Sequence, residues 1–245
     1  MKSERPPRMS DTLTDIRSQA ERAYQRLRGE ILHGDLMPGE RLRANDLQDR
    51  FQLGLTPIRE ALMRLSSEGL VSAETHRGSR VSETSLPEFS DLMATRRQIE
   101  RLCLTQAIAR GDAAWEAEIV AAMHLLSRTP LPASPDDREA AALWEAHHRR
   151  FHQALVSACG SDWLLRFWSM LADHSERYRK LRLLHRHEAQ AEVRDVNSEH
   201  AAIMDAVLAR DADKACALLD AHLAATETSV LRLLRAGTSE EETAG

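Results

Sequence analysis

Residues 24–81 constrain the fold of this chain more than any other stretch. Apolar residues recur at helical spacing within residues 20–33, 45–51 and 56–68, so a helix is predicted over each of these ranges. Pro57 fits the first turn of the third helix, where its missing N–H group leaves no hydrogen bond unmade. The stretch is therefore expected to form a small domain of three short helices.

Two short segments after the third predicted helix have the pattern of strands. Residues 70–73 and 80–82 are expected to pair as a hairpin, with His76, Arg77 and Gly78 at its tip. Three helices followed by such a hairpin form a winged helix-turn-helix, in which the hairpin is called the wing. Because the third helix of this fold usually lies in the major groove of DNA, the sequence favours duplex DNA as a partner.

The same stretch resembles the GntR family of bacterial regulators. The matching segments, with x for any residue, are Leu36-x-Pro38-Gly39-Glu40-x-Leu42, Thr56-Pro57-Ile58-Arg59-Glu60-Ala61-Leu62-x-x-Leu65-x-x-Glu68-Gly69-Leu70-Val71 and Arg77-Gly78-x-x-Val81. In this family the third helix contacts the major groove and the wing enters the minor groove. The resemblance therefore implies a transcriptional regulator that binds operator DNA.

The resemblance also implies particular DNA contacts. Arg59 is expected to contact a phosphate or a base edge, and Thr56 a phosphate. Asn45 and Leu55 stand where the family often carries arginine, and Leu55 could pack on a thymine methyl group instead. The predicted DNA-binding residues are Arg43, Asn45, Leu55, Thr56, Arg59, Arg64, His76, Arg77 and Gly78.

A chain of 245 residues is long enough for two domains, and its net charge of −5 does not itself favour a nucleic-acid partner. We expect a disordered tail over residues 1–18, the winged domain over 19–84, a helical domain over 85–235 and a second disordered tail over 236–245. No stretch is apolar enough to span a membrane and no signal peptide is recognisable, so a cytoplasmic protein is expected. The cysteines predicted to be free thiols in the core are Cys103, Cys159 and Cys216.

The second domain has an all-helical pattern. Ser85 and Glu88 form a capping box at its start, and Gly160 is suited to end a helix. Helices joined by short loops bury their apolar faces against one another, so an antiparallel bundle is expected and the whole chain should be mostly α-helical. The predicted helices cover residues 85–110, 112–127, 136–159, 162–185, 189–210 and 211–234.

Four histidines of this domain lie on predicted apolar helix faces. His148 and His152 are four residues apart and share one face of a helix, while His200 and His222 belong to two later helices. Any one of them alone could be a core histidine held by a neighbouring carbonyl or carboxylate. Four buried imidazoles together are costly unless each has a partner, and one shared metal ion would be a partner for all four.

The helical domain resembles the FCD ligand-sensing domain of the FadR subfamily of GntR regulators. The matching segments are Arg96-x-x-x-Glu100, Phe151-His152-x-x-Leu155, Glu199-His200-x-x-Ile203-x-x-Ala206, Asp211-x-x-x-Ala215 and His222-Leu223. Many members hold a divalent metal with an Asp and three His. His152, His200 and His222 match the three histidines, and His148 stands at the Asp position. The resemblance implies either a four-histidine site or a three-histidine site with His148 turned away; because imidazole suits transition metals, zinc or nickel is expected.

Arg96 lies on an apolar face of the first predicted helix of this domain, and an inward-facing guanidinium needs a carboxylate partner. That partner is either a buried Glu, in a structural pair, or a small carboxylate effector that bridges the metal and Arg96. In the second case the chain senses a ligand. In either case the resemblance implies a homodimer that binds two-fold operators, and the chain is expected to be a repressor.

Two other functions are compatible with a histidine site. The metal could be purely structural, because closed sites add folding stability, or it could activate water in a hydrolase. A hydrolase would need a general base at the ion. Glu199 is expected on a different helix face from His200, and Glu145 lies at the edge of its own apolar face. The set of residues is incomplete for catalysis, so no enzyme is expected.

Overall fold

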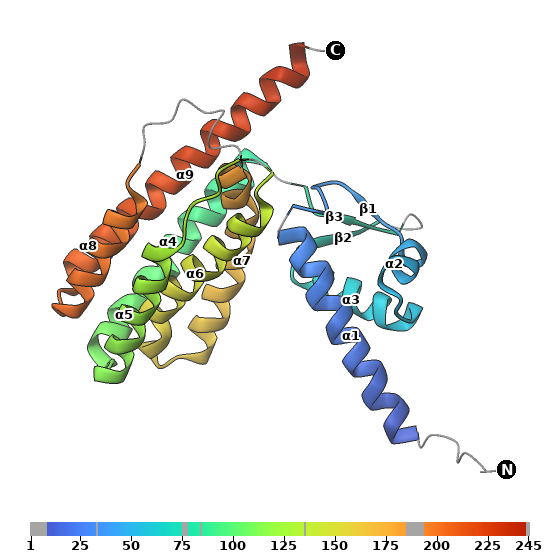
Figure 1. Ribbon diagram of the computed structural model, residues 1–245, viewed down its shortest axis with the longest axis horizontal. Coiled ribbons are helices and arrows are strands. Elements are labelled where there is room, and N and C mark those ends of the chain that lie inside the picture. Colours follow the sequence, from blue (N-terminus) through green and yellow to red (C-terminus); the bar gives the residue numbers. More distant parts are fainter. Residues whose placement is uncertain are drawn as a thin grey trace. The chain divides into compact units, whose positions relative to one another are not determined.

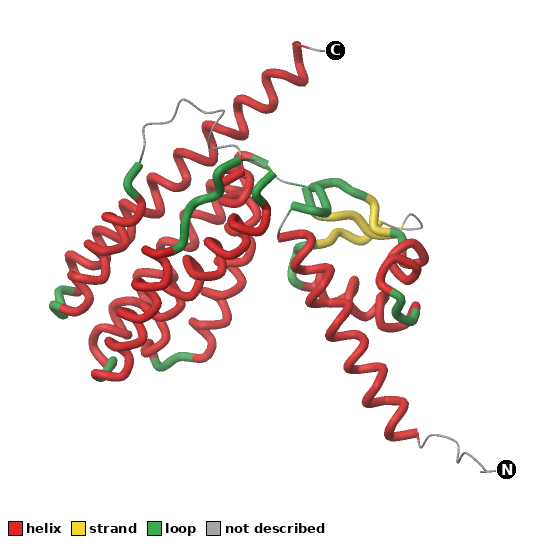
Figure 2. The backbone as a smooth tube through the Cα atoms, in the orientation of Figure 1, coloured by secondary structure: helices red, strands yellow, loops and turns green. Residues whose placement is uncertain are grey.

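The computed structural model describes residues 9–32, 34–74, 78–83, 85–134, 136–184 and 194–243. For residues 9–17, 74, 180–184 and 236–243 it describes the backbone and not the side-chain environment. The chain forms two compact units, one ending at Thr84 and the other beginning at Ser85. Figure 2 shows helix as the main secondary structure of both units, with strands only in the first among the described residues. The mostly helical fold class predicted from the sequence is confirmed.

The first unit is a winged helix-turn-helix (Figure 1). Its elements are α1 (Met9–Leu32), β1 (Arg41–Leu42), α2 (Ala44–Phe51), α3 (Leu55–Ser67), β2 (Val71–Glu74) and β3 (Gly78–Val81). Leu27, Ile58 and Leu65 are completely buried at the centre of its apolar core. Pro57 is buried in the first turn of α3, as the sequence predicted. These contacts fix α3 against α1 and leave its opposite face exposed.

The sheet of this unit has three antiparallel strands in the order β1-β3-β2. The central strand β3 pairs Ser79 with Leu42 of β1 and Val81 with Val71 of β2. The hairpin of β2 and β3 was predicted, whereas β1 was not. A strand of two residues has no alternation of apolar and polar side chains that a sequence pattern could reveal.

Helices extend into both of the ranges predicted to be terminal tails. Helix α1 begins at Met9, so residues 9–18 are helical where a tail was predicted. No proline or glycine occurs between Pro7 and Gly29, and a helix already anchored by packing extends at little cost. At the other end α9 continues to Thr243, beyond its predicted end at residue 234. Residues 1–8, 244 and 245 lie outside the described residues.

The second unit is a bundle of helices (Figure 1). Its elements are α4 (Leu86–Arg110), α5 (Ala113–Arg128), α6 (Arg138–Val156), the short 3-10 helix η1 (Ser157–Cys159), α7 (Asp162–Leu184), α8 (Val196–Leu208) and α9 (Ala212–Thr243). Ser85 caps α4 by accepting a hydrogen bond from the Glu88 N–H at 3.2 Å, and Gly160 takes a left-handed conformation with φ of +73° after η1. The start signal at Ser85 and the stop signal at Gly160, both identified in the sequence, are confirmed.

The helices of this unit pack against one another in pairs. Helix α4 packs against α7 and α9, α5 against α6, and α8 against α9. The three cysteines are buried and free, as predicted. None of the described helices is both long and apolar enough to cross a membrane.

Candidate metal centre and nucleic-acid interface

One groove of the first unit collects four of the residues predicted to contact DNA. We call it the α3 groove; it has a volume of about 1040 Å³ and is formed by the start of α2, one face of α3 and the wing strands. Arg43, Asn45, Arg59 and Gly78 line it, and all four are exposed. The fold therefore brings three separate segments of the sequence to one concave surface that carries positive charge.

Met63 is a groove residue that the sequence analysis missed. It lies one turn after Arg59 on α3, lines the same groove and has 73% of its surface exposed. Its spacing of four residues from Arg59 was the signal that could have identified it. Leu55 and Thr56 stand in the first turn of α3, half-buried and exposed respectively, outside the lining of this groove.

Arg64 was predicted to contact DNA, and in the structure it makes contacts within the first unit. Its guanidinium lies over the ring of Tyr24, with Cζ 3.6 Å from the ring centroid, and donates to Glu21 of α1 at 2.7 Å. Tyr24 in turn donates to Glu68 at 2.9 Å. Arg64 thus joins α3 to α1 and does not line the α3 groove, and its contact with DNA stays a prediction.

The wing is described at its base. His76 and Arg77, predicted to enter the minor groove, lie outside the described residues. Gly78 begins β3 with a φ of +91°, a conformation that favours glycine. Arg80 on the same strand donates to the carbonyl oxygen of Gly39 at 2.8 Å, which ties the wing to the turn before β1.

The second unit brings all four predicted metal ligands together. His148 and His152 come from α6, His200 from α8 and His222 from α9, and every one of them is buried. One ring nitrogen of each lies within 4.8 Å of those of the other three. His148 faces the other rings, with its centroid 4.5 Å from that of His152, as the four-histidine alternative requires. We call these four residues the histidine cluster.

Glu199 was expected on a different helix face from His200, and it lies beside His222, a contact that the sequence did not predict. Its Oε2 atom accepts a hydrogen bond from Nδ1 of His222 at 2.8 Å. Arg194, just before α8, donates to both carboxylate oxygens of Glu199 and to the carbonyl oxygen of His222. The prediction treated α8 alone, and it is the packing of α9 against α8 that brings His222 to Glu199.

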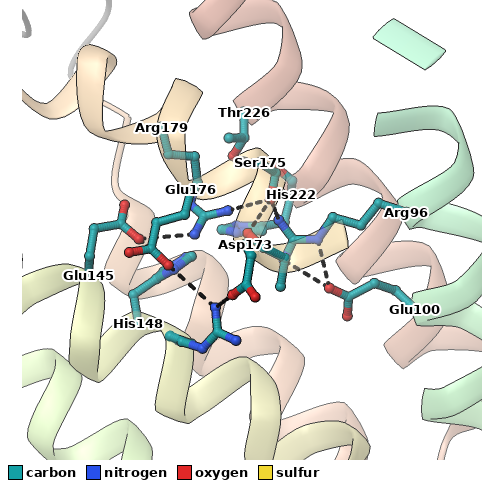
Figure 3. Close-up of polar contacts among 12 residues, drawn as sticks. Arg96, Glu100, Glu145, His148, Asp173, Ser175, Glu176, Arg179, His222 and Thr226 are labelled. Atoms are coloured by element: carbon teal, nitrogen blue, oxygen red, sulfur yellow. Dashed lines mark hydrogen bonds and ion pairs between the residues drawn. The ribbon is translucent and has the colours of Figure 1, made fainter. Parts of the chain in front are cut away.

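Arg96 is buried, as predicted, and its partner is a glutamate of its own helix. Nε and Nη2 of Arg96 donate to Glu100 Oε1 at 3.0 and 2.9 Å, and Nη1 donates to Ser175 of α7 at 2.6 Å (Figure 3). A buried Glu was one of the two partners that the sequence left open for Arg96, and Glu100 is that residue. The other carboxylate oxygen of Glu100, Oε2, has no hydrogen-bond partner among the described residues.

A second buried arginine, Arg179, was not identified from the sequence. It donates to the same Ser175 hydroxyl at 2.9 Å and to Glu145 at 3.0 Å, so Figure 3 shows the two guanidinium groups directed at one serine. Glu145 is fully inside the bundle, where the sequence placed it only at the edge of an apolar face, and its Oε2 lies 3.8 Å from Nδ1 of His148. Buried arginines and glutamates therefore surround the histidine cluster.

Comparison with known families agrees with this architecture. Residues 19–81 match the bacterial regulatory proteins of the gntR family, and residues 91–225 match the FCD domain. The chain belongs to the GntR family. Its FCD domain contains the complete histidine cluster and Arg96. Members of this family are transcriptional regulators that bind DNA, and the protein is such a regulator and not an enzyme.

The regulator is similar to several characterised and uncharacterised proteins. It is 40% identical over 211 residues to the uncharacterized HTH-type transcriptional regulator BphR of Paraburkholderia xenovorans (strain LB400), covering 86% of this chain and 84% of that protein. It is 36% identical over 200 residues to the HTH-type transcriptional repressor GlaR of Escherichia coli (strain K12), covering 82% and 90%. The solved structure of McbR/YncC of E. coli shares the fold, with a TM-score of 0.72 and 19% identity over 88% of this chain and 98% of that one.

The histidine cluster of the regulator fits a divalent transition metal. Within the described part of the chain, His152 and His200 have no hydrogen-bond partner on either ring nitrogen, and Nδ1 of His148 has none. Burying such polar atoms unpaired costs free energy, and a metal ion would satisfy one nitrogen of each ring. Two ligands of one zinc ion, each about 2.1 Å away, are at most about 4.2 Å apart, so the cluster would tighten slightly around an ion.

The electrostatics of the cluster also suit a metal. Burial, followed by the charge of neighbouring imidazoles, lowers the pKa of His148, His152 and His200 well below 6.5. Burial lowers the pKa of His222 to about 4, although Glu199 opposes this shift. All four imidazoles are therefore neutral at pH 7, and the neutral ring is the form that binds metal.

Proposed function

We propose that this regulator is a repressor that binds operator DNA as a homodimer, and that a small carboxylate bound at a histidine-held metal changes its affinity for DNA. The observation that carries the metal half of this proposal is the burial of four histidines with converging ring nitrogens. A bound zinc or nickel ion would supply a Lewis-acidic position for the carboxylate. The similarity to GlaR, which is named a repressor, supports repression.

The DNA half of the proposal rests on the α3 groove. Arg43 and Arg59 place two exposed positive charges on a concave surface formed by the helix-turn-helix and the wing. Leu55 and Met63 add apolar side chains on α3, and the thymine methyl group is the apolar feature of the major groove. Two copies of such a unit would match the two half-sites of a two-fold operator.

Arg96 is the proposed second anchor of the effector. Burial is the main cause that lowers the pKa of His152 and His222, and other neighbouring residues come next. The charge of Arg96 also lowers both pKa values, so Arg96 lies near the histidine cluster. A carboxylate bound to the metal would therefore feel the charge of Arg96 and compete with Glu100 for its guanidinium. Helix α4, which carries Arg96, begins at Leu86, and β3 of the wing ends at Val81, so a shift of α4 acts directly on the DNA-binding unit.

A structural metal without ligand sensing is the second candidate function. The observation in its favour is that all four histidines are buried, because structural sites are closed whereas sensing sites must admit a ligand. Thermal unfolding with and without a chelator, measured alongside DNA binding in the presence of carboxylates, separates the two. A structural metal raises the melting temperature and leaves the DNA affinity insensitive to acids.

The charge-balanced double variant Arg96→Gln/Glu100→Gln tests the effector site. Replacing Arg96 alone would leave Glu100 buried without its partner, which is strongly destabilising. We expect the double variant to fold and bind DNA normally and to lose the response of the wild type to acids from acetate to adipate. The measurement is fluorescence anisotropy with DNA flanking the gene of the regulator. A double variant that responds like the wild type would contradict the role of Arg96.

A further inference from the structure

His222 is held differently from the other members of the histidine cluster. Its Nδ1 atom lies 2.8 Å from Oε2 of Glu199. Among the described residues, His152 and His200 have no partner on either nitrogen. The Glu145 carboxylate is 3.8 Å from Nδ1 of His148, and that nitrogen has no hydrogen bond among the described residues. One of the four imidazoles thus has its orientation set by a carboxylate.

Glu199 is in turn held by an arginine. Nε and Nη2 of Arg194 donate to the two oxygens of the Glu199 carboxylate. The same guanidinium donates to the carbonyl oxygen of His222 at 2.8 Å and to the hydroxyl of Thr226 at 3.0 Å. Arg194 therefore fastens the start of α8 to the turn of α9 that carries His222, and the bidentate pair fixes the plane of the Glu199 carboxylate.

The protonation of His222 follows from these contacts. The guanidinium of Arg194 donates to both oxygens of Glu199, and a carboxylate held in this way can only accept hydrogen bonds. Nδ1 of His222, which lies 2.8 Å from Oε2 of Glu199, therefore carries the proton. Nη2 of Arg194, 3.1 Å from Nδ1, cannot donate to that protonated nitrogen and donates to the carbonyl oxygen instead. The lone pair of the ring is therefore on Nε2.

We propose that Glu199 is a positioning residue of the metal site. It fixes the tautomer and ring orientation of His222 so that Nε2 is presented to the ion, and Arg194 holds Glu199 in the required place. Histidine ligands generally depend on such a partner on their other nitrogen, and losing it weakens metal binding by about 10- to 100-fold. This inference rests on the metal of the proposed function.

The test compares Zn²⁺ affinity, measured by competition with a chromogenic chelator, in the wild type and three variants of Glu199. Glu199→Ala and Glu199→Met remove the acceptor, and Met also preserves the volume of the side chain. Both are expected to bind Zn²⁺ about 10- to 100-fold more weakly than the wild type. Glu199→Gln keeps an amide oxygen that accepts from Nδ1, and it is expected to retain most of the affinity.

Glu227→Ala is the matched control. Glu227 lies on α9, is half-buried like Glu199 and also binds an arginine, Arg97 of α4, at 2.9 Å, whereas its hydrogen bond does not involve the histidine cluster. Its removal costs an ion pair of the same kind and should leave Zn²⁺ affinity unchanged. A loss of affinity in this control as large as in Glu199→Ala would show that a general loosening of α9, and not the position of His222, is responsible.

Co²⁺ adds a measurement that a merely structural role of Glu199 would not change. The visible absorption of bound Co²⁺ reports the number and geometry of its ligands, and we expect it to change in Glu199→Met and to return to the wild-type form in Glu199→Gln. Wild-type affinity and spectra in the folded Ala or Met variant would overturn the positioning role and leave the metal intact. A wild type that binds neither Zn²⁺ nor Co²⁺ would overturn the metal and this inference together.

Discussion

The α3 groove and the histidine cluster place their functional side chains in opposite environments. Arg43, Asn45 and Arg59 are exposed in the groove, where water solvates them and they need no internal partner. His152 and His200 are buried, and their ring nitrogens have no protein partner among the described residues. The exposed groove residues reduce the free energy of unfolding very little, whereas the unpaired buried imidazoles destabilise the metal-free bundle.

This difference determines how much surrounding structure each site requires. An exposed arginine can contact DNA without any neighbouring residue that fixes its position. A buried imidazole requires neighbours that set its tautomer and balance its charge, and these include Glu199 and Glu145, with Arg194 and Arg179 behind them. A site built from buried polar groups therefore extends well beyond its ligands.

Replacing His200 with Leu should give the largest change in Zn²⁺ affinity. It tests directly whether the buried histidine cluster, unlike the exposed groove, destabilises the metal-free protein. We expect Zn²⁺ affinity to fall by more than about 100-fold, since losing a ligand costs more than losing its partner. The metal-free variant should be more stable by about 1–3 kcal/mol, because an unpaired buried imidazole is exchanged for an apolar side chain of similar size. Urea unfolding with a chelator measures this stability. A metal-free variant less stable than the wild type would show that His200 has a partner in solution.

Lowering the pH should destabilise the metal-free second unit selectively. The pKa of each cluster histidine is below 6.5 in the folded state, so the unfolded chain binds more protons as the pH falls below about 6.5. The unfolding free energy should drop by up to about 1.4 kcal/mol per pH unit for each histidine, and for His222 this continues to about pH 4.

Tryptophan fluorescence is the appropriate measurement for this pH effect, since all four tryptophans belong to the second unit. They are Trp115, Trp144, Trp163 and Trp168. Urea unfolding followed by this signal at pH 7.5, 6.5 and 5.5, with chelator present, gives the slope. A flat stability over this range would mean that the imidazoles are protonated or solvated in the folded bundle.

Replacing Arg59 with Ala should weaken operator binding by about 1–3 kcal/mol and leave Zn²⁺ affinity unchanged. Arg64→Ala on the same helix is the control, because Arg64 contacts Tyr24 and Glu21 within the domain. It should lower the stability of the first unit by no more than about 1 kcal/mol, as exposed ion pairs do, with little change in DNA affinity. Anisotropy titrations at fixed salt measure both. Equal losses of DNA affinity in the two variants would show that Arg64 also contacts DNA.

Much of the local structure could be predicted because its causes are local. The Ser85 cap, the stop at Gly160 and the first-turn position of Pro57 each follow from the chemistry of a few adjacent residues. The register of apolar residues also placed His148 and His200 inside the bundle, because a helix turns by a constant angle per residue. Strand β1 was missed because it has no sequence pattern of its own. It is a strand only because it pairs with β3.

What the sequence left open concerns side chains whose partners come from elsewhere in the chain. Arg64 lies off the apolar face of α3, and only the structure shows that it contacts Tyr24 and Glu21 of α1. Glu199 was expected on a different helix face from His200, and only the position of α9 shows that His222 meets this carboxylate. Arg96 was correctly placed inside, but Ser175 and Glu100 complete its contacts.

The sequence by itself determined the family, the winged helix-turn-helix, the helical bundle and the four histidines that converge within it, because motif spacing and helical periodicity are properties of the chain alone. Only the tertiary structure decided which arginine belongs to the groove, which carboxylate sits behind which imidazole, and that Arg96 is paired with Glu100. Those outcomes depend on distances between helices that are remote in sequence. A hydrogen bond or an ion pair is either made or lost over about 1 Å, which no periodicity can specify.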